Sequence, residues 1–196
     1  SLKPKIKGAV PTRPSDEILS KVETIFITLL NKISELDIFR RIMSGDNIVH
    51  LRNFKSALNV SYEGHLLLRP IGQTILSRAV GKIIKKGNMS LDEIFTKLNK
   101  VDKSKGFRQQ DYSNLWYKVT FDPFGKGRMI TSNQTLAADL LVYLVEGANR
   151  EKREELENNI KKLRSNDTGT SWTNFSGQEV PFNDDSDGSK FPISVR

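Results

Sequence analysis

A proline at position 70 interrupts an apolar run and opens a helical pattern, and this boundary constrains the fold more than any other feature. The segment 65–73 reads HLLLRPIGQ, and apolar residues then recur at helical spacing as far as Ile84. Proline suits the first position of a helix, where its missing N–H would have no partner. The sequence therefore predicts a buried connector that leads into a helix over residues 70–86.

Arg69 stands at this junction, between apolar neighbours. Its guanidinium has two alternative roles, because it either pairs within the fold or is presented to a phosphate. The structural role is favoured, since a charge flanked by apolar residues usually has its partner inside the protein.

The remaining apolar pattern predicts a mainly α fold. Steps of three and four residues between apolar positions are typical of amphipathic helices. They occur over residues 16–33, 36–42, 91–100, 136–145 and 148–165. We therefore expect a single helical domain over residues 15–165. A basic arm, residues 1–14, precedes this domain, and an acidic, extended tail, residues 166–196, follows it.

Local signals refine this prediction. Ser90 and Glu93 have the spacing of a capping box, which begins a helix. Aromatic and β-branched residues around a turn predict a small β element near 116–130. Residues 48–64 are ambiguous, and within them residues 48–51 suit a short strand without clean alternation.

Charge is distributed unevenly along the chain. The net charge is +8, and residues 166–196 carry five acidic against two basic residues, so residues 1–165 carry +11. A body this basic attracts polyanions such as nucleic acid, although a solvated lysine-rich surface explains the charge as well. The excess is concentrated over residues 82–108, where eight basic residues face three acidic ones.

These basic residues are the candidates for a nucleic-acid interface, with DNA favoured over RNA. Lysine and arginine neutralise phosphates and release counterions, so the affinity falls steeply with salt. The expected phosphate contacts are Lys85, Lys86, Lys103, Lys105, Arg108, Lys126 and Arg128.

Catalytic and cofactor motifs are missing from the sequence. It has no cysteine, which excludes disulfides and Cys-based metal sites. His50 and His65 belong to no metal-ligand motif, and neither a Walker A loop nor a nucleophile elbow is present. No apolar run approaches the length of about 18 residues that a membrane span needs. We expect a cytoplasmic protein with no cofactor, no metal and no catalytic residue of its own.

Two stretches resemble a known family. The segment 65–73 is similar to the R-P-I-G-Q segment in the C-terminal part of DGQHR-domain proteins, and a second similarity runs through residues 115–130 into the apolar helix at 136–145. The family includes the DndB-type regulators linked to DNA phosphorothioation. The D-G-Q-H-R signature itself is absent here and is expected upstream in a longer protein, so its activity does not carry over. The resemblance implies a DNA-associated role in bacterial defence.

The leading hypothesis is thus a non-catalytic accessory or regulatory domain that binds DNA. Two alternatives stay open. One is a helical protein-interaction module, whose helix 148–165 has a narrow stripe (Leu156, Ile160 and Leu163) that a partner or a second copy would cover. The other is a fragment of a nuclease or nucleotide hydrolase whose catalytic site lies outside this chain.

Overall fold

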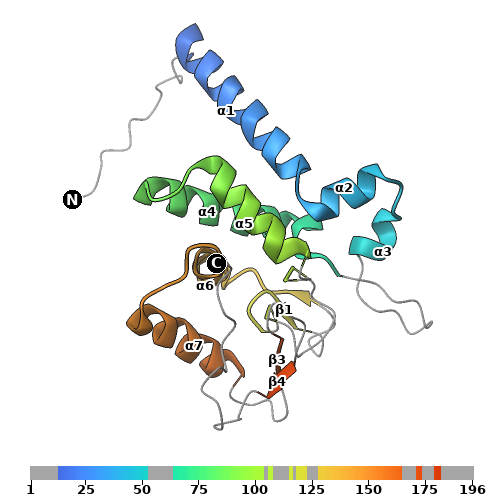
Figure 1. The fold of residues 1–196 in the computed structure, drawn as a ribbon, viewed down its shortest axis with the longest axis vertical. Coiled ribbons are helices and arrows are strands. Elements are labelled where there is room, and N and C mark those ends of the chain that lie inside the picture. The colour runs from blue at the N-terminus through green and yellow to red at the C-terminus, as the bar shows by residue number, and fades with distance from the viewer. Residues whose placement is uncertain are drawn as a thin grey trace, which may run out of the picture.

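The computed structural model describes residues 13–52, 64–103, 106–107, 115–116, 118–122, 128–164, 171–173 and 179–181. These residues form one mainly helical domain with very little strand, which confirms the predicted fold class (Figure 1). The helices are α1 (Asp16–Ser34), α2 (Asp37–Met43), α3 (Ile48–Arg52), the 3₁₀ turn η1 (Leu66–Leu68), α4 (Pro70–Lys86), α5 (Leu91–Lys103), α6 (Gln134–Glu146) and α7 (Arg150–Arg164). The strands are β1 (Phe121–Asp122), β2 (Arg128–Met129), β3 (Ser171–Thr173) and β4 (Glu179–Pro181).

Helix α6 is the centre of the core. Eight of its thirteen residues are buried, from Ala137 to Val145, because its sequence is apolar on almost every face. In Figure 1 it is seen end-on, with α4 and α5 on one side and α7 on the other. Helix α4 contributes the largest facing surface, including Ile75, Ala79 and Ile83, which are at most 1% exposed.

The Pro70 boundary is where the sequence predicted it. Pro70 opens α4, and Gly87 closes the helix in the left-handed conformation, with a φ of 72°. Gly72 allows a close approach between α4 and η1, because a Cβ on this residue would lie 1.9 Å from the Leu66 carbonyl oxygen. The glycine of the R-P-I-G-Q segment is therefore required by packing of the helix start against the preceding turn.

Helix α1 differs from the other long helices, because it projects from the body (Figure 1). It has no buried residue, and only its last turns contact the core, through the partly buried Leu29 and Ile33. Lys32 anchors the same end with an ion pair of 2.7 Å to Asp92 on α5. Most of the apolar surface of α1 is left uncovered.

Helix α7 is covered within the chain, contrary to the prediction that its stripe needs a partner. Leu156 and Ile160 are buried against the core, and Leu163 is 36% exposed. The stripe packs on α6, so it does not motivate self-association through residues 148–165.

Other local predictions have mixed outcomes. The capping box is confirmed, since Glu93 N–H donates to Ser90 Oγ and Ser90 N–H donates to the Glu93 carboxylate at 2.8 Å. Residues 48–52 form the short helix α3, so the expectation of a strand was wrong there. The Asn47 side chain accepts from Val49 N–H at 2.9 Å, which begins a helix instead.

The small β element near 116–130 is confirmed as an antiparallel pair in which Phe121 faces Met129. In the predicted tail, β3 and β4 form a second antiparallel pair, with Trp172 opposite Val180. Most of the predicted arm and tail lies outside the described residues, so their boundaries remain predictions. Within the described part of the chain, no helix is long and apolar enough to cross a membrane.

Candidate anion-binding groove

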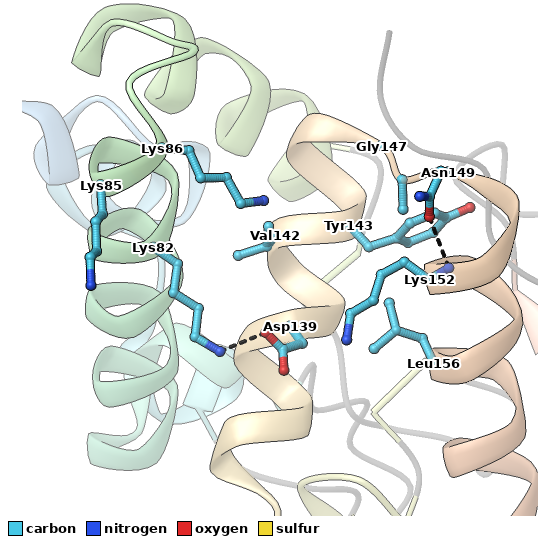
Figure 2. Close-up of a pocket in the computed structure, with 11 residues that line it drawn as sticks. Lys82, Lys85, Lys86, Asp139, Val142, Tyr143, Gly147, Asn149, Lys152 and Leu156 are labelled. Carbon is cyan, nitrogen blue, oxygen red and sulfur yellow. Dashed lines mark hydrogen bonds and ion pairs between the residues drawn. The ribbon is translucent and has the colours of Figure 1, made fainter.

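A groove of about 650 Å³ lies between α4 and the hairpin formed by α6 and α7 (Figure 2). Its volume is in the range typical of small-ligand sites. Four lysines line it from two different helices, together with one carboxylate and a short apolar wall. The lining residues are Lys82, Lys85, Lys86, Asp139, Val142, Tyr143, Gly147, Ala148, Asn149, Lys152 and Leu156.

The packing of α7 brings the fourth lysine to the groove. Lys152 and Leu156 are one helical turn apart and therefore share a face of α7. Leu156 is 1% exposed, so its burial turns Lys152 toward α6. Asn149 begins this helix by accepting from Lys152 N–H at 2.9 Å. The amino-terminal end of α7 borders the groove, and its dipole favours a bound anion.

Two of the groove lysines hold the helices together. Lys82 Nζ lies 2.6 Å from Asp139 Oδ1, and Lys86 Nζ lies 2.5 Å from Glu146 Oε2. Both pairs join α4 to α6. Lys97 supports the same helix from α5, because its Nζ donates to the Val145 carbonyl at 3.1 Å. Three of the eight basic residues over 82–108 thus stabilise the packing around α6.

The other two groove lysines are available to a ligand. Lys85 makes no ion pair with any residue that the structure describes. Lys152 pairs with Glu155 at 2.8 Å, but both side chains are about half exposed, and such surface pairs are weak. With Glu146 and Glu155 included, four lysines face three carboxylates, which leaves the groove a net charge of +1.

Tyr143 contributes its ring to the groove wall, and its hydroxyl points toward α7 (Figure 2). Burial raises the pKa of its phenol, with Arg153 and Glu157 as smaller influences of opposite sign. The residue is 5% exposed and stays neutral at physiological pH. The groove wall therefore gains no charge from this residue.

Only two of the sequence-predicted contacts meet in this groove, namely Lys85 and Lys86. Lys103 is exposed at the end of α5, about 18 Å along that helix from its start at 1.5 Å per residue. Arg128 lies in β2, in register with Asp122. Lys105, Arg108 and Lys126 lie outside the described residues.

Arg69 is engaged inside the protein. Its Nη2 donates to the Arg52 carbonyl at 2.7 Å, which ties the start of α4 to the end of α3. Burial lowers the pKa of the guanidinium, and the nearby Arg52 lowers it further. This contact with the Arg52 carbonyl agrees with the structural role of Arg69, in which the guanidinium has its partner inside the protein.

His65 is also part of the framework. Its Nδ1 accepts from Leu67 N–H at 3.3 Å, so Nε2 carries the proton and donates to Asp102 at 2.7 Å. Asp102 in turn accepts from Ile38 N–H at 2.9 Å. His65 and Asp102 are 3% and 6% exposed, and they join η1, α5 and α2. No group of three or more potential metal ligands occurs in the described segments.

Comparison with known proteins does not identify the chain. No protein-family model matches it, and neither does any curated protein or solved structure. The similarity to DGQHR-domain proteins therefore stays a prediction from short segments.

Proposed function

We propose that this protein is a non-catalytic DNA-binding domain and that the lysine groove contacts the phosphate backbone. The observation that carries the proposal is that Lys82, Lys85, Lys86 and Lys152 all line one groove, two of them without a strong internal partner. Lysine suits a phosphate because its ammonium group is a compact point charge with three donors.

The charge of the whole body supports the same proposal. The excess of +11 over residues 1–165 attracts a polyanion from a distance, whereas the groove itself carries only +1. We therefore assign two roles. The net positive charge of the body attracts the nucleic acid, and the groove then fixes the position of one phosphate. The resemblance to DndB-type regulators adds, as part of this proposal, a place in DNA modification and bacterial defence.

The groove is tested with a double variant, Lys85→Ala with Lys152→Ala. Neither residue supports the fold strongly, so the variant is expected to fold normally. Fluorescence anisotropy with labelled duplex DNA, single-stranded DNA and RNA measures the affinity of each. We expect the wild-type protein to prefer duplex DNA and the double variant to bind it more weakly.

The matched control removes the same charge from the same two helices outside the groove, through Arg78→Ala with Lys161→Ala. Arg78 is exposed on α4 and does not line the groove, and Lys161 pairs with Glu157 at 2.7 Å on α7. If both variants lose the same affinity, binding follows overall charge and the groove has no special role. Competition by a free nucleotide as strong as that by DNA would instead identify the groove as a small-ligand site.

A further inference from the structure

The proposed function does not use the uncovered apolar surface of α1. Seven large apolar side chains on this helix are between 39% and 60% exposed: Ile18, Leu19, Val22, Ile25, Phe26, Ile27 and Leu30. Soluble monomers rarely expose a contiguous apolar surface of this kind, and such a surface marks an interaction site.

The local sequence of α1 also calls for a covering partner. Residues 18–28 contain six β-branched residues, which have low helix propensity. An isolated helix of about this length is marginal in water, because most helical stability in proteins comes from packing an apolar face. Only the last turns of α1 pack on the body, so a partner is needed to stabilise the rest.

Charge on the two borders of the apolar face indicates which partner fits. At about 100° per residue, the apolar residues other than Ile27 fill one arc centred between Val22 and Phe26. Lys21 lies along one border of this arc, and Asp16 and Glu23 lie along the other. Lys21 is available, since its pair with Glu17 is fully on the surface.

Two such helices have complementary borders only when they run in the same direction. In a parallel pair the basic border of each helix faces the acidic border of the other, whereas in an antiparallel pair like charges meet. We propose that α1 pairs in parallel with α1 of a second copy of this chain, through the face that contains Val22 and Phe26.

The oligomeric state tests this pairing directly. Size-exclusion chromatography with light scattering is expected to give twice the chain mass of 22.2 kDa at high concentration. Phe26→Glu places a carboxylate at the centre of the face and is expected to give a monomer. Thr24→Glu adds the same charge on the polar face of the same helix and is expected to leave the dimer intact. Because residues 18–28 lie outside the core, both variants should keep the unfolding midpoint of the body.

Cysteine cross-linking tests the direction, because the natural chain has no cysteine. In a parallel pair, Val22→Cys and Phe26→Cys, which flank the centre of the face, each meet their own copy, so both single variants are expected to form a disulfide-linked dimer on oxidation. An antiparallel pair aligns at most one of these positions with itself. A single-chain mass at every concentration, cross-linking at only one position, or equal loss of the dimer with Thr24→Glu would overturn the proposal.

Discussion

Replacing Asp102 by alanine is expected to destabilise the protein more than almost any other single change to a polar residue. The carboxylate accepts from His65 Nε2 at 2.7 Å and from Ile38 N–H at 2.9 Å, and its side chain is 2% exposed. A hydrogen bond to a charged group contributes about 1.5–3 kcal/mol, and the alanine variant leaves two buried donors without an acceptor. We expect a loss of about 3–5 kcal/mol, which is a large fraction of the 5–15 kcal/mol typical of a domain.

Urea unfolding followed by far-ultraviolet circular dichroism measures this loss. Asp92→Ala is the matched control, because Asp92 is on the same helix but its side chain is 76% exposed, in a surface pair with Lys32. Its loss is expected to be about 1 kcal/mol or less. Asp102→Asn, which keeps one acceptor oxygen, should fall between the two. If Asp102→Ala destabilises no more than Asp92→Ala, the buried network does not hold η1, α5 and α2 together.

Two further predictions concern α4 and α5. Gly72→Ala should destabilise the fold by about 1–3 kcal/mol, because the added Cβ meets the Leu66 carbonyl. In the control Gly81→Ala the added Cβ meets no atom within 4 Å, so this variant should stabilise α4 by about 0.5–1 kcal/mol. Equal effects of the two variants in urea unfolding would refute the close approach. Hydrogen bonds from the Ser90 backbone and hydroxyl lower the pKa of Glu93 in the folded protein. The Glu93 carboxylate therefore contributes fully to the free energy of unfolding above its ordinary pKa of about 4.3, and this contribution is lost as the pH falls through the lowered pKa. The difference in unfolding free energy between wild type and Glu93→Gln should shrink over that pH range, and a difference independent of pH would contradict the capping role.

The elements that the sequence predicts well are those with local signals at both ends. Pro70 and Gly87 mark α4 to the residue, and Ser90 with Glu93 marks the start of α5. The sequence did not predict helix α3, because its five residues are too few to show the apolar spacing of a helix. Its first two residues, Ile48 and Val49, are β-branched and favour a strand. That segment is held by contacts distant in sequence, such as the bond from His65 N–H to the Leu51 carbonyl at 2.8 Å.

The candidate groove could be predicted only in part. Lys85 and Lys86 stand out in a basic run, but Lys152 lies in a helix of mixed charge more than sixty positions away. The apolar residue one turn later, Leu156, was the available signal, since it fixes which face of α7 turns inward. What no local pattern shows is that this face packs on α6 beside α4. For the same reason the sequence could not show that Lys82 and Lys86 are paired with Asp139 and Glu146.

The salt dependence of duplex DNA affinity tests the central claim most directly. Each lysine–phosphate contact contributes a slope of about −0.9 to the logarithm of affinity against the logarithm of salt concentration. The double variant Lys85→Ala with Lys152→Ala is therefore expected to flatten the wild-type slope by about 2. No binding of wild-type protein to duplex DNA at low salt, or an unchanged slope in the double variant, would contradict a phosphate-binding groove.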